Sequence, residues 1–275
     1  MKFTILGSSG FVGSHIVKEL KQSQVEYYAP ARDENLLDKE LGNIIYCIGL
    51  TADFRKRPYD TVEAHVCKLR EVLKECEFNS LTYLSSTRLY IHNKDLEMVD
   101  EQTPIPVNVM DPFDLFNVSK LTGELLTLNC GRENVRVARL SNVYGFDFNS
   151  ENFITSIIKD AVAENKVTLR TTPDSSKDYI SINDVVQLLI KISLHGKNSI
   201  YNVASGNNTS NLDVLNVLKQ ETGCAIDFIP SAEKIAFPRI NIDKIKTEFG
   251  FHSPHRLTDD LKEIILRYKL SVAKN

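Results

Sequence analysis

The sequence predicts an α/β fold in which a doubly wound parallel sheet is followed by a smaller C-terminal lobe. Short apolar runs alternate with helix-length amphipathic segments over residues 1–145, which is the pattern of repeated β-α units around a parallel sheet. Residues 146–275 are expected mainly to form the smaller lobe, except that 183–205 return to the main sheet. A chain of 275 residues is long enough to bury a core of this size.

The chain begins with a predicted strand, a glycine turn and a helix in immediate succession. Residues 2–6 are apolar and partly β-branched, and a helical spacing of apolar residues runs from the last glycine to Leu20. The glycines are spaced G-x-x-G-x-x-G. In a dinucleotide site they permit the tight turn, the approach of a pyrophosphate to the helix N-terminus, and close packing of helix on strand. The predicted cofactor contacts in this Rossmann-type loop are Gly7, Ser9, Gly10, Phe11, Val12 and Gly13.

The second predicted strand, residues 25–29, ends where such a fold selects its cofactor. A carboxylate at this point binds the ribose 2′-hydroxyl of NAD, whereas an arginine accommodates the 2′-phosphate of NADP. Both kinds are present, as Arg32 and Asp33. Because Ala29 and Pro30 offer no acid at the strand tip, Arg32 favours NADP, with NAD as the alternative. Asp33 is equally compatible with a solvated loop charge.

Two more strands and a long helix are predicted before residue 90. Residues 43–48 and 81–84 are short apolar runs, and residues 58–76 form an amphipathic pattern with proline in the first turn. Gly49, directly after the third strand, is a further predicted cofactor contact. Only a short helical piece, residues 34–41, is expected between the second and third strands. This edge of the sheet is therefore expected to lack a strand and helix that a full Rossmann half would have.

The remaining motifs recur in a fixed order along the chain. They are Ser85–Tyr90 after a strand, Lys120 on a helix over 112–129, R-x-x-N-V-Y-G at 139–145, K-D-Y-I-S-I-N-D-V at 177–185, Y-N-V-A-S-G at 201–206, and the closing segment 239–250. Together with the glycine loop, this set resembles the extended short-chain dehydrogenases/reductases of the NAD-dependent epimerase/dehydratase family, which act on nucleotide-activated sugars. The resemblance covers nearly the whole chain.

The resemblance implies roles for individual residues. Lys120 would bind the nicotinamide ribose and lower the pKa of a neighbouring phenol, while Ser86 or Thr87 would hold the reacting sugar oxygen. Asn142 and Arg239 would contact the substrate in a C-terminal substrate-binding lobe. The cations available for a diphosphate are Arg170, Lys177 and Arg239. Of these the resemblance favours Arg239, whereas Lys177 is interpreted as a surface charge.

One departure from the family pattern affects the chemistry. Phe116 stands four residues before Lys120, where the family has the tyrosine that transfers the proton at the sugar oxygen. Loss of a general acid–base group costs roughly 10²–10⁴-fold in rate, so this chain is expected to be nearly inactive by that route. The predicted catalytic positions are Ser86, Phe116 and Lys120.

Three explanations of Phe116 remain open. The tyrosine was replaced deliberately to trap a substrate, or a natural variant uses Tyr90 or Thr87 as proton donor, or the protein has abandoned catalysis and become a regulatory binder. A pseudoenzyme has no chemical reason to retain the rest of the site, which favours the first explanation. The retained residues are Ser86, Lys120, Asn142 and Arg32.

The function predicted from these observations is reduction of a keto-sugar nucleotide by NADPH, most simply a 4-keto-6-deoxyhexose nucleoside diphosphate. Arg32 indicates a cofactor that is released and re-reduced, and residues 25–38 resemble those of an NADPH-using relative. No second acid–base pair for epimerisation is identifiable. The alternatives are a nucleotide-sugar epimerase or dehydratase with NAD(P), and a non-catalytic binder of NADP or sugar nucleotide.

Composition limits the partners and the environment. The 33 basic and 36 acidic residues nearly cancel, so nucleic acid and anionic membranes are not expected partners. Five scattered cysteines without a CxxC, and no signal-peptide pattern, favour reduced thiols in the cytoplasm. The histidines have no metal-ligand spacing, so no metal is predicted. Helices 58–76 and 116–129 carry more apolar positions than one face needs, which predicts a homodimer with a four-helix contact.

Overall fold

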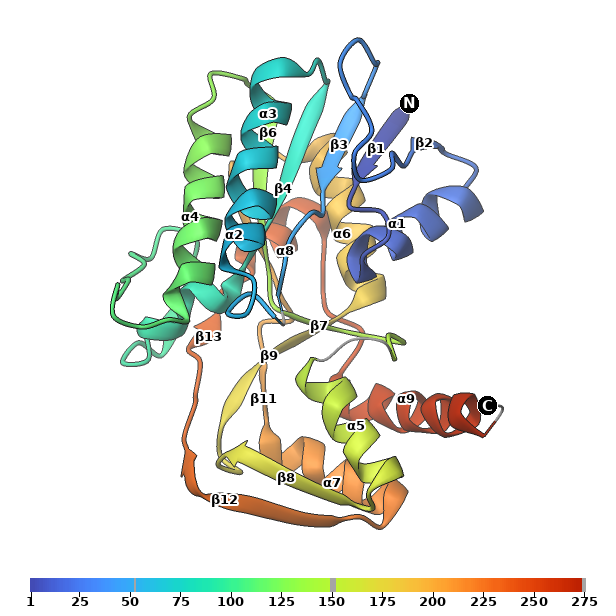
Figure 1. The fold of residues 1–275 in the computed structure, drawn as a ribbon, viewed down its shortest axis with the longest axis vertical. Coiled ribbons are helices and arrows are strands. Elements are labelled where there is room, and N and C mark those ends of the chain that lie inside the picture. Colours follow the sequence, from blue (N-terminus) through green and yellow to red (C-terminus); the bar gives the residue numbers. More distant parts are fainter. Residues whose placement is uncertain (52, 149–151, 274–275) are drawn as a thin grey trace.

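The computed structural model describes residues 1–51, 53–148 and 152–273. Figure 1 shows a larger lobe, which contains the N-terminus, above a smaller lobe built from the later part of the chain. Within the described residues, no helix is both long enough and apolar enough to span a bilayer.

The larger lobe is organised around a six-stranded, fully parallel sheet. Its strands are β1 (Lys2–Leu6), β2 (Glu26–Tyr28), β3 (Asn43–Tyr46), β4 (Ser80–Ser86), β6 (Val135–Leu140) and β10 (Ile200–Val203). They lie side by side in the order β10-β6-β4-β3-β1-β2. Strand β2 is therefore the edge strand, which confirms the shortened edge expected from the sequence.

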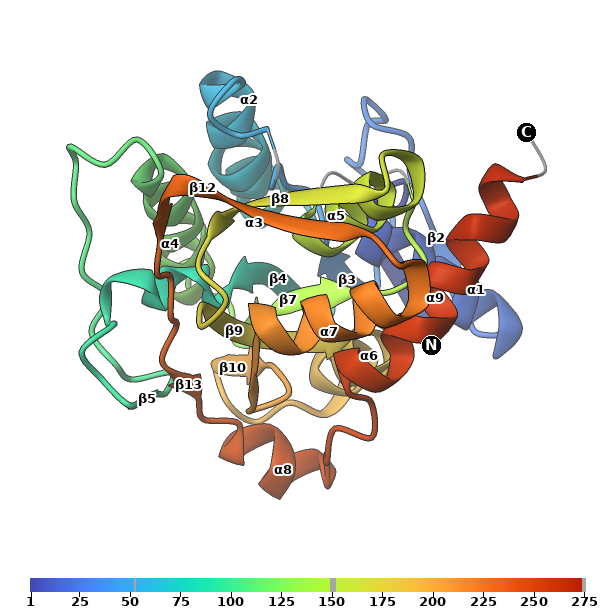
Figure 2. The ribbon, with the colours of Figure 1, turned by 90° about the horizontal axis from the view of Figure 1, so that it is seen from below.

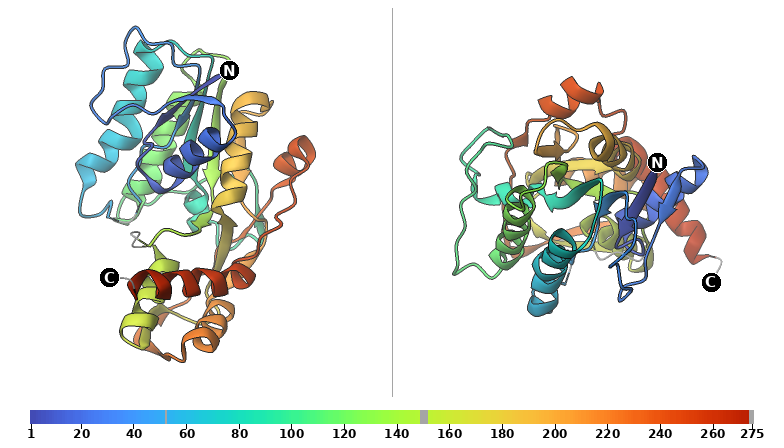
Figure 3. Two further views of the ribbon diagram at one scale, coloured as in Figure 1. Left: turned by 90° about the vertical axis from the view of Figure 1, so that its right-hand side faces the viewer. Right: turned by 90° about the horizontal axis from the view of Figure 1, so that it is seen from above.

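Helices cover both faces of the sheet, which confirms the predicted α/β fold. On one face α1 (Phe11–Gln22) packs against α6 (Ile182–His195). On the other face α4 (Asp114–Leu128) packs against one helix formed by α2 (Pro58–Val62), η1 (Glu63–Cys67) and α3 (Lys68–Glu75). Figure 3 shows these two helical layers with the sheet between them.

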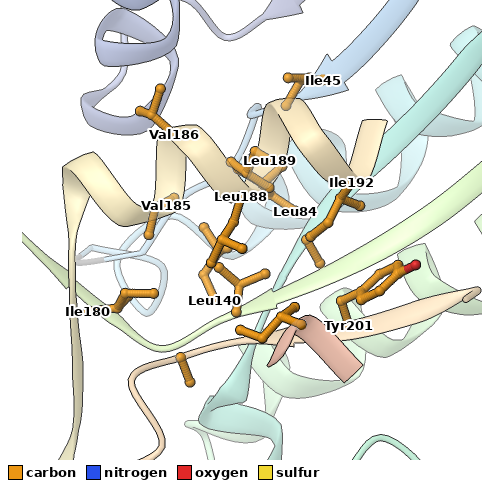
Figure 4. Packing of buried hydrophobic residues seen from close by; sticks show 14 of the residues in the cluster. Ile45, Leu84, Leu140, Ile180, Val185, Val186, Leu188, Leu189, Ile192 and Tyr201 are labelled. Atoms are coloured by element: carbon orange, nitrogen blue, oxygen red, sulfur yellow. The ribbon is translucent and has the colours of Figure 1, made fainter. Parts of the chain in front are cut away.

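The α6 side of the sheet contains the largest core cluster. Figure 4 shows apolar side chains of α6 packed among side chains of the strands beneath it. From α6 come Val185, Val186, Leu188, Leu189 and Ile192, and from the strands Ile45, Leu84, Leu140, Ile180 and Tyr201. Each of these side chains is buried. A second cluster, which includes Tyr46, Leu69 and Tyr83, fills the opposite face.

The smaller lobe has a core of its own. Its helices are α5 (Phe153–Ala163), α7 (Asn211–Thr222) and α9 (Leu257–Val272), and its parallel strand pair is β8 (Lys166–Thr171) with β12 (Ala225–Glu233). Figure 2 shows β8 and β12 running side by side, with α7 alongside them. Apolar residues of α5, α7, α9 and β8 form a separate buried cluster. The division of the chain near residue 145 remains a prediction.

Two small sheets connect the lobes. A three-stranded sheet joins β7 (Asn142–Tyr144), β9 (Ser176–Ser181) and β11 (Asn208–Ser210), and a parallel pair joins β5 (Met98–Val99) to β13 (Arg239–Ile240). The short helices are η2 (Thr87–His92) and α8 (Asp243–Phe249).

The structure differs from the predicted secondary structure in two details. Residues 34–41 form turns rather than a helix, because Asp38 and Gly42 have positive φ angles of 61° and 61° and the Glu34 side chain is bonded to Tyr28 and Lys39. The predicted helix 58–76 is continuous but contains the π-helical segment η1. Such segments often occur at functional sites.

The order of the strands locates a ligand crevice. After β1 the chain crosses to β2 on one side, and then returns to β3 on the other side of β1. Ligands of open α/β sheets bind at such a reversal, outside the carboxyl ends of the strands. In Figure 1 these ends face the smaller lobe.

Candidate active site

The glycine loop joins the carboxyl end of β1 to α1. Gly7 has φ +83°, and a Cβ there would lie 2.9 Å from the backbone of Cys47; a Cβ on Gly13 would lie 2.3 Å from the oxygen of Gly7. A Cβ on Gly10 would meet nothing closer than 3.4 Å. The fold itself therefore requires Gly7 and Gly13, while the space over Gly10 is open for a ligand. Gly10 is the N-cap of α1, and no side chain caps that helix end.

The loop after β2 carries the residues predicted to select the cofactor. Glu34 accepts hydrogen bonds from the Tyr28 hydroxyl at 2.6 Å and from the Ala31 amide at 3.0 Å, and it pairs with Lys39. These bonds hold the pKa of Glu34 low, at about 2. Arg32 lies in the loop that they fold, and its guanidinium is exposed and has no ion pair among the described residues. Asp33 is also exposed.

Lys120 is buried at the carboxyl end of β4. Its ammonium donates a hydrogen bond of 2.8 Å to the Leu84 carbonyl and lies 5.0 Å from the ring centroid of Tyr83. Burial lowers the pKa of Lys120 to about 7 and raises that of the neighbouring Cys47 thiol to about 12. A Cβ on Gly49, which is exposed, would lie 3.3 Å from the ammonium. Lys120 therefore ends directly beneath the loop that follows β3.

His65 joins this loop to α4, and sequence reasoning missed it. Its Nε2 accepts the Leu50 amide at 3.2 Å, so its Nδ1 donates to Ser119 Oγ at 2.8 Å. Burial, and then the charge of Lys120, lower the pKa of His65 to about 2, so the imidazole is neutral. A histidine within the apolar stripe of a predicted helix was the available signal. His65 lies in the π-helical segment, beside both Lys120 and the ring of Phe116.

Phe116 occupies a buried aromatic site one turn before Lys120. Only 3% of its surface is exposed, and its ring contacts those of Phe54 and His65, with centroids 5.4 Å away in both cases. The helix register therefore places Phe116 and Lys120 on one face of α4, as the Y-x-x-x-K pattern requires. Phe116 therefore has the aromatic ring of the family's tyrosine but lacks its hydroxyl.

Ser86 and Thr87 lie where β4 passes into η2. Ser86 is the N-cap of η2, and its Oγ accepts the Arg88 amide at 3.1 Å. Thr87 is buried. Both follow Leu84, the residue whose carbonyl binds Lys120, so the structure brings Ser86, Thr87, Phe116 and Lys120 to the same end of the sheet.

Tyr90, one of the alternative proton donors, lies in η2, and its hydroxyl is already hydrogen-bonded. Its hydroxyl lies 2.9 Å from both the Asp100 carbonyl and Asn202 Oδ1, and it accepts from Arg139 at 2.8 Å. Arg139, the first residue of the motif at 139–145, is in turn paired with buried Glu124, which gives this motif residue a structural role. Burial raises the pKa of Tyr90 to about 12. This geometry does not support Tyr90 as a proton donor.

The predicted substrate contacts are more scattered. Asn142 is exposed at the start of β7, and its amide donates to the Asp178 carbonyl at 2.8 Å. Arg239 is exposed on β13, and no described contact links its side chain to the residues around Lys120. The interpretation of Lys177 as a surface charge is wrong. It is partly buried on β9 over the rings of Phe153 and Tyr179, and burial lowers its pKa to about 8.

One group of potential metal ligands occurs among the described residues. Ligand atoms of His92, Asp111 and Asp114 lie within 4.8 Å of one another. Asp114 already accepts hydrogen bonds from His92, Asn108 and Asn117. These bonds account for the cluster without an ion.

The fold and the site together define the class of protein. A parallel sheet with a glycine loop at its reversal point, and a buried lysine bonded to β4 two residues before Ser86, are the arrangement of a Rossmann-type protein of the extended short-chain dehydrogenase/reductase kind. The chain belongs to the NAD dependent epimerase/dehydratase family, whose model matches residues 3–204.

Individual relatives are distant, but the alignments with them cover most of this chain. A UDP-glucose 4-epimerase from Lactobacillus helveticus is 21% identical, over 95% of this chain and 94% of its own length. Among solved structures, MoeE5 in complex with UDP-glucose and NAD matches with a TM-score of 0.82 and 19% identity, over 99% of this chain and 100% of its own. RMD from Pseudomonas aeruginosa complexed with NADPH has a TM-score of 0.82 and 20% identity, over 98% and 99%. These structural likenesses establish the fold.

Proposed function

We propose that the chain binds NADP and a nucleotide sugar, and that its site is built to reduce a keto group of the sugar. The observation that carries this proposal is the arrangement on α4 and β4. Lys120 bonds to the carbonyl of Leu84, two residues before Ser86 at the carboxyl end of β4, and the ring of Phe116 lies one helical turn before the lysine. These residues support a reductase site that departs from the family pattern by the hydroxyl missing at Phe116.

The cofactor would supply a hydride, and the protein's residues would do the rest. The open N-terminus of α1 would bind the pyrophosphate, with Ser9, Phe11 and Val12 in the same turn and Gly49 on the opposite side of the crevice. Lys120 would bind the nicotinamide ribose, and Ser86 with Thr87 would hold the reacting oxygen of the sugar. Asn142 and Arg239 would contact the nucleotide part of the substrate. Phe116 would pack against the sugar and transfer no proton.

Arg32 supports NADP over NAD. Its guanidinium is exposed, unpaired within the described residues, and located after β2 in a loop fixed by Glu34. A free guanidinium at this point suits the 2′-phosphate, which it can bind through charge-assisted hydrogen bonds. The structures of relatives contain NAD in one case and NADPH in another.

Reduction is preferred over epimerisation or dehydration because of the residues next to Ser86. Thr87 and Arg88 offer no carboxylate for a second proton transfer. Relatives named as UDP-glucose 4-epimerase and dTDP-D-glucose 4,6-dehydratase keep those two activities as the alternatives.

A second candidate function is binding without turnover, and Phe116 favours it. The ring is buried between Phe54 and His65, so the site is well packed in its present form. A protein in this state would bind NADP and sugar nucleotide as a sensor.

We also propose a homodimer formed through α2–α3 and α4. Apolar side chains are exposed along these helices, with exposed fractions of 89% for Tyr59, 61% for Leu125 and 41% for Val118. Pairing with a second copy would bury them in a four-helix contact.

The decisive experiment compares the present chain with Phe116→Tyr. Both are assayed with NADPH and NADH against keto-sugar nucleotides, beginning with 4-keto-6-deoxyhexoses. A reductase predicts a gain of at least ~10²-fold from the restored general acid. A pure binder predicts no turnover from either protein, and ordinary turnover by the present chain would disprove the assigned role of position 116.

A further inference from the structure

Two arginines share one aromatic ring at the start of α4. The guanidinium carbon of Arg55 lies 4.5 Å from the ring centroid of Phe113, and that of Arg88 lies 5.5 Å from it. Burial lowers the pKa of Arg88; the charges of Asp111 and Asp114 raise it, and the charge of Arg55 has a smaller effect that lowers it. A carboxylate at ion-pair distance would stabilise both guanidiniums.

The protein itself supplies no such interaction at ion-pair distance. No described carboxylate forms a salt bridge with Arg55 or Arg88, and Nε of Arg88 is buried without a hydrogen-bond partner. Asp111 and Asp114 act on Arg88 only through their charge. Asp114 accepts hydrogen bonds from His92, Asn108 and Asn117, and Asp111 accepts one from the Phe113 amide. A buried polar atom without a partner calls for an explanation.

A third cation lies in the three-stranded sheet that connects the lobes. Lys177 on β9 has no carboxylate partner among the described residues, and Arg88 is the charged group that acts on it. Its ammonium lies 4.7 Å from the ring centroid of Phe153 and 5.5 Å from that of Tyr179. The anion that would balance these charges therefore belongs between the two lobes.

The position of Arg88 ties this charge to the reacting part of a substrate. Its amide donates to Ser86 Oγ at 3.1 Å, and Ser86 is the predicted contact of the reacting sugar oxygen. Phe113, which orders both guanidiniums, lies one turn before Phe116 on the same helix end. The backbone of Arg88 is thus bonded directly to the residue predicted to contact the sugar, and its guanidinium is a cation in addition to any that binds the diphosphate.

We propose that Arg55 and Arg88, with Lys177 opposite, form a subsite for a carboxylate carried by the sugar of the nucleotide sugar. A planar guanidinium can donate hydrogen bonds to both oxygens of a carboxylate. The ring of Phe113 positions two such guanidiniums before a ligand binds. The inference rests on the proposed function, because it names the substrate class of the same site. It replaces the uncharged 6-deoxyhexose with a uronic acid sugar.

Matched sugar nucleotides test the subsite by calorimetry in the presence of NADP. UDP-glucuronate is compared with UDP-glucose, GDP-mannuronate with GDP-mannose, and UDP and GDP serve as sugar-free probes. The proteins are the present chain, Arg88→Gln, Arg55→Gln and the control Lys56→Gln, which removes an exposed charge next to Arg55. Arg55 is exposed, so its replacement leaves the fold intact even if Arg88→Gln proves unstable.

The present chain should bind the uronate at least tenfold more tightly than the neutral sugar on the same base, a difference of about 1.4 kcal/mol. Arg88→Gln and Arg55→Gln should each reduce this preference at least threefold. Their affinities for the neutral sugar nucleotide and for the free nucleotide should stay within twofold of those of the present chain. Lys56→Gln should change nothing.

Equal affinities for uronate and neutral sugar would overturn the subsite and leave the proposed function standing. An equal loss of uronate, neutral sugar and free nucleotide in Arg88→Gln would assign the arginine to the diphosphate and also overturn it. Failure of every nucleotide and sugar nucleotide to bind, with NADP bound, would instead refute the proposed function and the subsite with it.

Discussion

The ring of Phe116 stands edge-on to the imidazole of His65, with centroids 5.4 Å apart and planes at 86°. His65 is fixed in turn by Ser119 and by the Leu50 amide, so the position of the Phe116 ring is set by its surroundings and not by its para substituent. A phenol at this position would therefore place its hydroxyl without rearrangement of the helix.

The first prediction concerns Lys120 in a protein that carries Phe116→Tyr. Adding Lys120→Met should abolish the gain in turnover, because the phenol then lacks the cation that stabilises its ionised form. Lys120→Arg should retain part of the gain, since the charge remains. Steady-state rates with a saturating keto-sugar nucleotide measure the effect. Equal rates in the Phe116→Tyr protein with and without Lys120→Met would contradict it.

The second prediction concerns Arg32 and the choice of cofactor. Arg32→Ala should weaken NADPH binding by roughly 1.5–3 kcal/mol, the range for hydrogen bonds to charged groups, and leave NADH binding nearly unchanged. Asp33→Asn should change the binding of NADPH little, because the 2′-phosphate is the group being selected. Titration of both cofactors by calorimetry decides between the two residues. A preference for NADH in the unaltered chain would assign selection to Asp33.

The third prediction concerns pH and the burial of Lys120. The pKa of this ammonium falls from 10.5 to about 7 in the folded protein. Below pH 7 the folded state carries the full penalty of the buried charge. Between pH 7 and pH ~10 the folded state has released the proton that the unfolded chain retains, so the free energy of unfolding rises with pH. Lys120→Met should therefore stabilise the protein most at pH 6, and the difference should shrink by roughly 2 kcal/mol at pH 9.

Urea unfolding of the unliganded proteins at both pH values measures this difference. Because the unaltered chain and Lys120→Met share all other titratable groups, the titration of those groups cancels in the difference between their free energies of unfolding. Loss of the hydrogen bond to Leu84 changes this difference equally at both pH values, so it does not affect the pH dependence. A difference that is independent of pH would mean that the ammonium stays charged throughout.

The fourth prediction concerns the exposed apolar face of α4. Leu125→Lys should convert a dimer into a monomer, because it places a charge at the centre of the proposed four-helix contact, beside Arg70 and Lys74. Leu266→Lys on α9 is the matched control, since Leu266 is also exposed, at 55%, but lies on the smaller lobe. Sedimentation at micromolar concentration measures the oligomeric state of each protein. Monomer in the unaltered chain, or dissociation by the control alone, would exclude this interface.

The strands of the main sheet could be predicted because of their burial. A strand covered on both faces is rich in apolar residues, and the apolar residues of β1, β3, β4 and β6 mark these strands in the sequence despite the polar residues among them. Strand β12 was not predicted, because most of its residues are exposed and show neither alternation nor an apolar run. Its structure comes from pairing with β8.

The candidate site was predictable where backbone chemistry or a motif marks it, as at Gly7, Gly13 and Lys120. It was not predictable where the environment of a side chain depends on distant elements. The apolar stripe around His65 indicates its burial but not its partners, and Lys177 shows no distinguishing local pattern. The contacts of both arise only when distant elements come together. The position of Phe116 was evident from the sequence, but its packing against Phe54 and His65 was not.

The return of β10 to the main sheet has a consequence for the way the chain acquires its structure during synthesis. Ile200 pairs with Val137, a separation of 63 residues, and α6, which covers one face of the sheet, follows α5, β8 and β9 along the chain. Until residue 203 has left the ribosome, β6 is an unpaired edge beside an uncovered apolar face, a state that favours aggregation. We therefore expect the two lobes to mature together, and a chain that stops at Gly145 to require a chaperone rather than to form a free cofactor-binding domain.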